Sequence, residues 1–365
     1  MFTITRNNFS LGFVLLAVLA PSWSYALDLS MFADVQYRDS DKQGDKNAFV
    51  LGPVDLYAMQ YVDDKTRAFT EIVVESRQGE FGIDVERLWI SRNLSENLSF
   101  SAGRFHTPLG YWNRTYHHGA LLSDTISRPF FLDFEEDSGS IMPMHFVGVM
   151  MLGDVPVNGG FFEYQLHLGN GPSLDTSPSG TGDLHVNTEH DHNRAKSPGL
   201  RVVYHDNDLP LQVGVFGMRN DISEAGLSAT SSGLAAGDTL VEQTIYGLDM
   251  NLRLDHLDAT AEWYRLKNDD VYASAGSHVA TAYYLQLGYR LSYAIKPVYR
   301  YEALNTEAAD VYFNLLNVQQ TTRQVLALRY DLDENNALKF EITRPKIQGQ
   351  DGYTTFGAQW AFLLE

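Results

Sequence analysis

Hydrophobic and polar residues alternate with a period of two along most of the chain. Around residues 29–38, apolar residues fill every second position, and Ser30, Asp34 and Arg38 lie between them. This period predicts β-strands with one apolar and one polar face. The segments with this pattern, about sixteen in number, are 29–38, 54–62, 68–77, 83–91, 98–105, 145–152, 160–169, 200–205, 211–218, 243–254, 257–266, 281–292, 295–302, 322–331, 337–344 and 353–364.

The connections between these segments alternate in length. Short polar turns, such as 63–65, 255–256 and 334–336, follow the even-numbered segments, and longer connections follow most of the odd-numbered ones. An even number of antiparallel strands with short turns at one end and longer loops at the other is typical of outer-membrane barrels. We therefore predict an all-β fold, a transmembrane antiparallel β-barrel of about sixteen strands. A soluble β-sandwich with buried aromatic residues is the alternative.

The last segment favours the barrel. Phe356, Trp360 and Phe362 share one of its faces, and Thr355 and Gln359 share the other. Such a strand suits pairing with the first strand to close the barrel, because an open sheet edge in lipid leaves backbone groups unsatisfied. Candidates for the aromatic girdles of a barrel are Trp263, Tyr283, Tyr289, Tyr299 and Tyr301.

The connection from His106 to Pro143 is the longest of all. Loops of this length are usually functional or disordered. Aromatic residues argue for a packed loop, since disordered segments are poor in them; they are Tyr111, Trp112, Tyr116, Phe130, Phe131 and Phe134. We predict that 106–143 is the third external loop, that it folds inward against the barrel wall, and that it narrows a water-filled pore.

The N-terminus has the pattern of a secretory signal peptide. Arg6 precedes an apolar run at 9–20, which is too short to span a bilayer as a helix. Ser24 and Ala26 supply the small residues of a cleavage site. We predict a signal peptide at 1–26 and the barrel at 27–365; a buried N-terminal helix is the alternative.

Composition narrows the classes of function. The formal net charge is −19, which argues against nucleic acid as a partner. The chain has no cysteine and so has no disulfide framework, although export would permit one. No later stretch holds about eighteen consecutive apolar residues, so we expect no transmembrane helix after the signal peptide.

Residues 102–105 read AGRF and residues 107–110 read TPLG, immediately before and within the start of the long loop. With that loop and the aromatic last strand, the mature chain resembles the Gram-negative outer-membrane porins and, more loosely, their phosphate-selective branch. The resemblance implies a homotrimer of channels with the third loop folded into each barrel. The chain departs from the family in one respect, since porins usually end on an aromatic residue and this chain continues from Phe362 to Glu365.

Charged residues of the long loop and of the polar strand faces are the candidate site. The predicted constriction consists of Arg114, His117, His118, Arg128, Asp133, Glu135, Glu136 and Asp137. The predicted pore wall contributes Arg201, Arg290, Arg300 and Arg323. In a lumen such charges set ion selectivity, and opposite signs across the gap create a transverse field. The alternative is that they only solvate the wall.

Histidines suggest a second chemistry. His185, His190 and His192 lie in the loop after segment 160–169, and imidazole is a ligand for zinc, copper or nickel. Their spacing matches no defined metal site, so we expect a solvated loop and no metal or cofactor. The sequence also has no Gly-x-Ser-x-Gly, His-Glu-x-x-His or phosphate-loop motif, and we expect no enzyme.

The sequence thus predicts a porin, a passive diffusion channel for small hydrophilic solutes or ions across the outer membrane, with lipid around it. The alternative is an outer-membrane metal-binding receptor or hydrolase that uses the His-rich loops. The acidic chain favours weak cation preference, whereas the arginines could form a local anion site. Both selectivities stay open at this point, as does the choice between a general and a substrate-specific pore.

Overall fold

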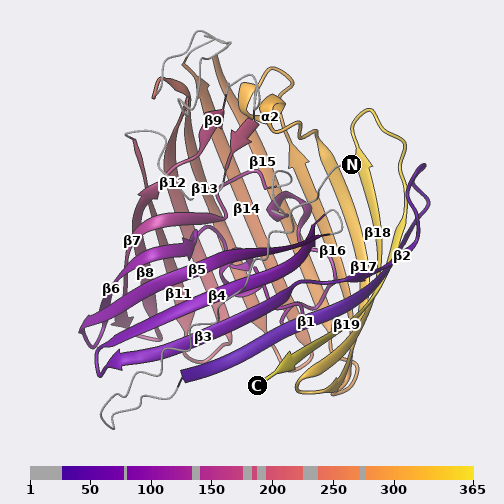
Figure 1. Cartoon of the computed structure of the whole chain (residues 1–365), viewed down its shortest axis with the longest axis horizontal. Coiled ribbons are helices and arrows are strands. Elements are labelled where there is room, and N and C mark those ends of the chain that lie inside the picture. The colour runs from indigo at the N-terminus through magenta and orange to yellow at the C-terminus, as the bar shows by residue number, and fades with distance from the viewer. Residues whose placement is uncertain are drawn as a thin grey trace, which may run out of the picture.

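The computed structural model describes residues 27–77, 80–133, 140–175, 183–186, 195–224, 237–271 and 276–365. Over these residues, one antiparallel sheet closes on itself into a barrel of 16 long strands (Figure 1). Closure occurs where β1 (Leu27–Ser40) pairs with β19 (Thr355–Leu364), the indigo and yellow strands that lie side by side in the figure. The predicted fold class is confirmed, and the two-sheet sandwich is wrong.

The other long strands follow one another around the barrel in chain order. They are β3 (Val54–Asp63), β4 (Thr66–Arg77), β5 (Glu80–Ser95), β6 (Leu98–His106), β7 (His145–Val157), β8 (Gly160–Asn170), β11 (Lys196–Asp206), β12 (Leu211–Glu224), β13 (Thr239–Arg253), β14 (Leu257–Asp270), β15 (Gly276–Tyr289), β16 (Ile295–Asn305), β17 (Thr321–Asp333) and β18 (Asn336–Ile347). Each predicted segment corresponds to one of these strands. The predicted ends at 254, 292 and 353 overshoot, because turn or loop residues occupy those positions.

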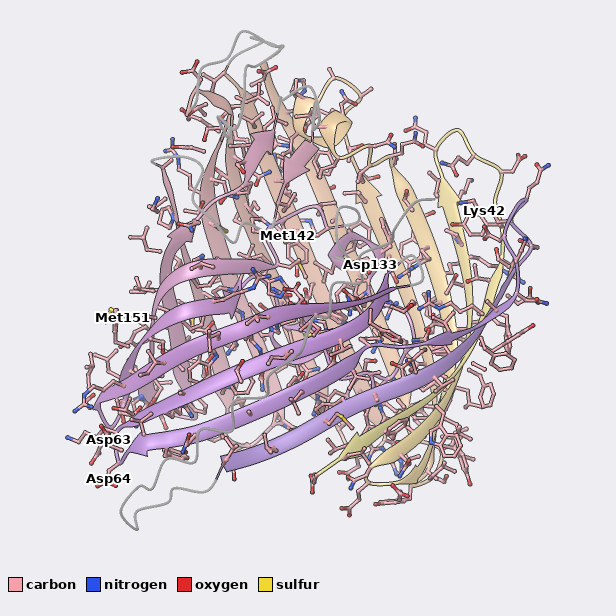
Figure 2. The ribbon with its side chains drawn as sticks, viewed as in Figure 1. Lys42, Asp63, Asp64, Asp133, Met142 and Met151 are labelled. Carbon is pink, nitrogen blue, oxygen red and sulfur yellow. The ribbon has the colours of Figure 1, made fainter. Side chains whose placement is uncertain are left out.

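Shorter elements lie in the long connections. They are β2 (Ala48–Leu51), β9 (Ser173–Asp175), β10 (Asp183–His185) and α2 (Val311–Leu315). Figure 2 places Asp63 and Asp64, at the short turn between β3 and β4, at the opposite end of the molecule from Lys42, which lies between β1 and β2. Short turns and longer connections thus gather at different ends, as predicted.

Neighbouring side chains of a strand point to opposite faces of the sheet. On β18, Phe340 and Ile342 are 42% and 41% exposed, whereas Lys339 and Glu341 are 0% and 4% exposed. Polar residues therefore face the inside of the barrel and apolar residues face outward. Tyr283, one of the predicted girdle residues, is also exposed on the outer face.

The long loop (residues 107–144) joins β6 to β7 and contains α1 (Trp112–Thr115) and η1 (Phe130–Leu132). Many of its apolar residues belong to a buried cluster with side chains of β12–β16 and α2. The cluster includes Leu109, Trp112, Phe131, Met142, Ile245, Tyr264, Leu304 and Tyr312. The expectation of a packed loop is therefore confirmed for the aromatic residues that the structure describes; Phe134 lies outside them.

The predicted signal peptide, residues 1–26, lies outside the described residues. In the part of the chain that is described, no helix has both the length and the apolar character needed to cross a membrane.

Candidate pore constriction

The start of the long loop is held by a buried carboxylate of β14. Oε1 of Glu262 accepts hydrogen bonds from the backbone N–H groups of Tyr111 (3.0 Å) and Trp112 (2.5 Å). The hydroxyl of Tyr284 donates to the same oxygen (3.0 Å), and that of Tyr264 donates to Oε2. The carboxylate thus satisfies N–H groups at the start of α1 that have no partner within the helix.

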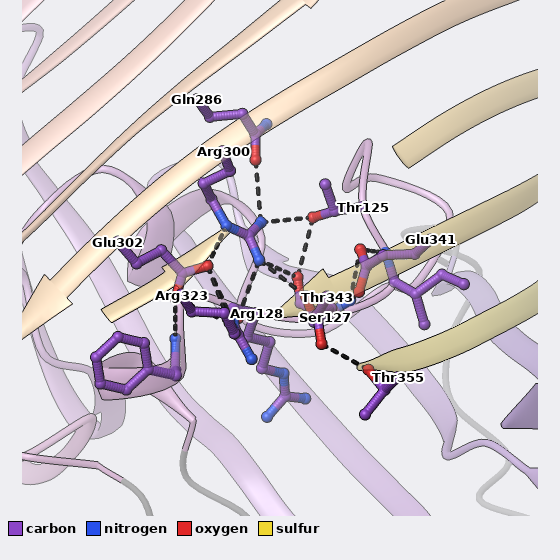
Figure 3. A network of polar contacts seen from close by, with 12 residues as sticks. Thr125, Ser127, Arg128, Gln286, Arg300, Glu302, Arg323, Glu341, Thr343 and Thr355 are labelled. Carbon is purple, nitrogen blue, oxygen red and sulfur yellow. Dashed lines mark hydrogen bonds and ion pairs between the residues drawn. The ribbon is translucent and has the colours of Figure 1, made fainter. Parts of the chain in front are cut away.

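The middle of the loop is bound by Arg300 of β16, one of the predicted pore-wall residues (Figure 3). Its Nη1 donates to Oγ1 of Thr125 at 2.7 Å. Its Nη2 donates to the carbonyl oxygens of Ser127 (2.9 Å) and Arg128 (3.1 Å). Arg300 is 0% exposed, so these bonds form away from bulk water and are stronger than at a surface.

A second arginine and a buried glutamate complete this network. Nε of Arg300 and Nη2 of Arg323 lie 2.6 Å and 3.0 Å from Oε1 of Glu302. Arg323, on β17, also donates to the carbonyl oxygen of Arg128, and Oε2 of Glu302 accepts from the N–H of Phe130 (2.8 Å). The carboxylate that pairs with Arg300 and Arg323 therefore belongs to the barrel wall, on β16, and not to the loop. The loop offers these arginines backbone carbonyl oxygens.

Charged side chains of β17 and β18 bind residues 120–127 of the loop. Arg329 and Lys339 donate to backbone carbonyl oxygens of residues 120–123, with the two Arg329 bonds at 2.6 and 2.9 Å. Glu341 accepts from the backbone N–H groups of residues 126–127 at 2.9 and 3.1 Å. Inward-facing residues of three consecutive strands, β16 to β18, thus hold one continuous stretch of the loop.

The other two predicted pore-wall arginines form ion pairs with strand carboxylates. Nη2 of Arg201, which is buried, lies 2.6 Å from Oδ1 of Asp249. Nη2 of Arg290 lies 3.8 Å from Oδ2 of Asp258, and the Arg290 side chain is 46% exposed. Arg290 follows the end of β15 and so stands at a turn instead of within a strand.

Some of the charged residues predicted for the constriction form ion pairs, and others lie outside the described residues. Nη1 of Arg114 lies 3.3 Å from Oε1 of Glu163 on β8, and Nη1 of Arg128 lies 3.9 Å from Oδ1 of the exposed Asp133. The remaining predicted acids, Glu135, Glu136 and Asp137, lie outside the described residues. The same holds for His190 and His192, whereas His185 is described only through its backbone in β10.

The predicted loop histidines meet residues that sequence reasoning did not bring together. One possible ligand atom from each of four buried residues lies within 4.8 Å of the others; the residues are Glu86, His106, His117 and His145. His118 adjoins them, with Nε2 3.4 Å from Oε1 of Glu86 and Nδ1 3.5 Å from Oδ1 of Asp55. The signal that could have found this group is that His106 ends one strand and His145 begins the next.

The two adjacent loop histidines differ in protonation state. Burial lowers the pKa of His118, but Asp55 and Glu86 outweigh burial and raise that pKa to about 10. Burial, together with the nearby His106 and His145, holds the pKa of His117 well below its usual value. At neutral pH, His118 is therefore charged and His117 is neutral.

A cavity of ≈ 710 Å³ lies between the long loop and the strands β1, β3, β4 and β17–β19. Among the described residues that line it, seven carboxylates outnumber four Lys and Arg side chains and the charged His118; they are Asp34, Asp39, Asp45, Asp55, Glu75, Asp133 and Glu341, with Arg38, Lys46, Arg128 and Arg323. Of the predicted site residues, His117, His118, Arg128, Asp133 and Arg323 line this cavity. The cavity is thus polar and of mixed charge.

No family model and no curated protein matches the chain. In fold, it is similar to the anion-selective porin from Comamonas acidovorans (13% identity, 93% of this chain and 100% of that chain, TM-score 0.62). It is also similar to the outer membrane channel DcaP of Acinetobacter baumannii (9% identity, 94% and 99%, TM-score 0.61). A third similar structure is the trimer form of OmpT, an outer membrane protein of Vibrio cholerae (11% identity, 93% and 100%, TM-score 0.58). At these identities the likeness shows the fold, a porin-like barrel of 16 strands.

Proposed function

We propose that the chain is an outer-membrane porin, a passive diffusion channel for small hydrophilic solutes or ions, and not an enzyme. One observation carries the proposal: a closed barrel has apolar residues on its outer face and polar residues around an internal cavity of ≈ 710 Å³. An apolar outer face suits lipid, and a polar interior suits water and hydrated solutes. Residues 1–26 would direct export and then be removed.

In this proposal, the long loop folds into the barrel and forms the constriction. The support comes from backbone hydrogen bonds between the loop and the inward-facing Arg300, Arg323, Lys339 and Glu341. These residues belong to strands far from the loop in the sequence, so they would hold it across the lumen. Charged residues of the loop, with Glu135, Glu136 and Asp137 among them, would then filter ions.

We propose weak cation preference, because carboxylates outnumber basic side chains around the cavity among its described residues. Arg128 and Arg323 would supply a local anion site within the cavity. The loose resemblance to phosphate-selective porins would then concern this site. A homotrimer is part of the proposal and has support from the trimer form of the similar OmpT structure.

Planar-bilayer recording of the refolded chain under a salt gradient tests this function. The wild-type chain should open channels whose zero-current potential indicates weak cation selectivity. Asp133→Asn should move that potential toward anion selectivity and Arg128→Gln toward cation selectivity. Asp333→Asn, at the end of β17 and away from the cavity, is the control and should leave the zero-current potential unchanged.

Absence of channels from the folded wild-type protein would overturn the porin function. Channels whose selectivity ignores both Asp133 and Arg128 would leave a pore but overturn the constriction that we assign to the long loop.

A further inference from the structure

Glu86, His106, His117 and His145 gather where the long loop leaves and rejoins the wall. Glu86 comes from β5, His106 is the last residue of β6, His145 is the first residue of β7, and His117 belongs to the loop. All four are nearly inaccessible, at 5%, 9%, 2% and 3% exposure in the order of the chain. Their ligand atoms lie within 4.8 Å of one another.

The backbone explains how three strands contribute to one point. His106 and His145 lie directly opposite each other at the end of the β6–β7 ladder. Glu86 occupies a β-bulge, since Glu71 pairs with Arg87 whereas the next residue, Ile72, pairs with Val85. A bulge redirects a side chain, and here the side chains of both Glu86 and Arg87 point into the barrel.

The loop histidine is oriented by an outer contact. Nδ2 of Asn113 donates to the carbonyl oxygens of Thr107 (2.9 Å) and Met144 (3.0 Å), which fixes the orientation of the amide. Oδ1 of Asn113 therefore accepts from Nδ1 of His117 at 2.5 Å. In the neutral ring this leaves the lone pair on Nε2, which lies 4.0 Å from Oε2 of Glu86. Outer contacts of this kind set the tautomer of histidines that bind metal ions.

The donor set matches a zinc-class cation. Three imidazoles and one carboxylate form a common four-coordinate shell, in which Zn–N and Zn–O distances of about 2.0–2.2 Å hold ligand atoms about 3.4 Å apart. Nε2 of His145 lies 2.6 Å and Nε2 of His117 lies 4.0 Å from Oε2 of Glu86, on either side of that separation. Small side-chain rotations would bring the four atoms to tetrahedral spacing.

The three imidazole rings of the group pack closely together. The rings of His106 and His117 lie 4.0 Å apart between centroids, and those of His117 and His145 lie 4.4 Å apart. A divalent ion would share the negative charge of Glu86 with His118, and would lie near Glu71, which pairs with Arg87 and whose Oε2 is 3.8 Å from Nε2 of His106. His117 also borders the cavity of ≈ 710 Å³.

We propose that Glu86, His106, His117 and His145 bind one zinc-class divalent cation that joins the long loop to β5, β6 and β7. This goes beyond the proposed function, because the ion is a fixed structural component and not a permeating solute. It also differs from the alternative of metal capture by His185, His190 and His192, which belong to another connection.

The test is zinc binding by the refolded full-length barrel, measured by calorimetry and by metal content after removal of metal with a chelator. Wild type should bind one Zn²⁺ per chain at this site. His117→Ala should abolish that binding, and His117→Cys should restore it, since a thiolate is also a zinc ligand. Asn113→Ala, which removes only the orienting contact, should weaken binding about 10–100-fold.

Two controls separate this site from other histidines. His167→Ala removes a buried histidine of β8 outside the cluster and should leave binding unchanged. Combined His185→Ala, His190→Ala and His192→Ala should also leave it unchanged. The proposal is overturned if folded wild-type protein binds no zinc, or if binding survives His117→Ala unchanged. None of these readouts depends on conduction, so they stand or fall separately from the porin function.

Discussion

The backbone N–H of Trp112 donates a 2.5 Å hydrogen bond to Oε1 of Glu262, a residue 150 positions later in the chain. The same oxygen accepts from the preceding N–H, of Tyr111. One buried carboxylate of β14 thereby fixes the point at which the long loop turns away from β6. A buried N–H group without a partner is costly, so this contact should be measurable as stability.

Glu262→Ala should lower the free energy of unfolding by about 1–3 kcal/mol for each N–H group left unsatisfied. Urea unfolding of the barrel refolded in lipid vesicles measures the change. Glu242→Ala is the matched control, because its side chain is 46% exposed and pairs with Arg219 at 3.1 Å. Loss of that surface pair should cost about 1 kcal/mol or less. Equal effects of the two substitutions would contradict the role of Glu262.

Gly110→Ala tests how closely the loop approaches β14. Gly110 has a φ of 78°, and a Cβ there would lie 2.1 Å from Oη of Tyr264. Gly44 has a φ of 94°, but a Cβ there would have no atom within 4 Å. Both substitutions should cost about 1–2 kcal/mol for the left-handed backbone.

Only Gly110→Ala should add the cost of overpacking, about 1–3 kcal/mol. The comparison of urea midpoints for the two variants isolates this second contribution. Indistinguishable midpoints would mean that the loop does not contact Tyr264 as described.

Arg300→Met should destabilise the barrel by about 3–5 kcal/mol, because it breaks a fully buried ion pair and leaves loop carbonyl oxygens without a donor. Arg290→Met makes the same chemical change at a half-exposed residue 3.8 Å from its partner, and should cost at most about 1 kcal/mol. Parallel unfolding curves of the two variants provide the measurement. A larger loss for Arg290→Met would refute the assignment of Arg300 as the residue that holds the loop.

The barrel could be predicted from the sequence because alternation along a strand is a local signal. Phe340 and Lys339 are adjacent in the sequence, and their opposite faces follow from the period alone. The same alternation placed Arg300 and Arg323 on the inner face. That they bind the loop backbone and share Glu302 depends on the register of β16 against β17 and on the path of the loop, neither of which is a local property.

The histidine cluster shows a second limit of the pattern. The sequence drew attention to His117 and His118 as neighbours, but His106 and His145 meet them only because β6 and β7 pair in one register. Glu86 joins them through a bulge, which shifts the alternation by one residue and has no marker such as glycine or proline at that point. Contacts of this kind appear only when strands are paired in space.

Phe340→Arg tests whether the outer face meets lipid. Phe340 is 42% exposed near the middle of β18, and an arginine at the bilayer midplane should cost about 2–4 kcal/mol. Phe49→Arg is the control, since Phe49 is 82% exposed on β2 in a connection and should change stability by about 0.5 kcal/mol or less. Folding yields and unfolding energies in vesicles measure both. If the two arginines are tolerated equally, the outer face of β18 does not contact hydrocarbon.

The central claim is that solutes pass through the barrel beside the long loop, and cysteine modification during single-channel recording tests it most directly. The natural chain has no cysteine, so a single introduced thiol is the only target. Ala120→Cys places it in the loop at the edge of the cavity, and Ile342→Cys places it on the outer face. A bulky, charged thiol reagent should lower the conductance of the Ala120→Cys channel and leave that of Ile342→Cys unchanged. Unaltered conductance in both variants, or no channels from the folded chain, would contradict the account.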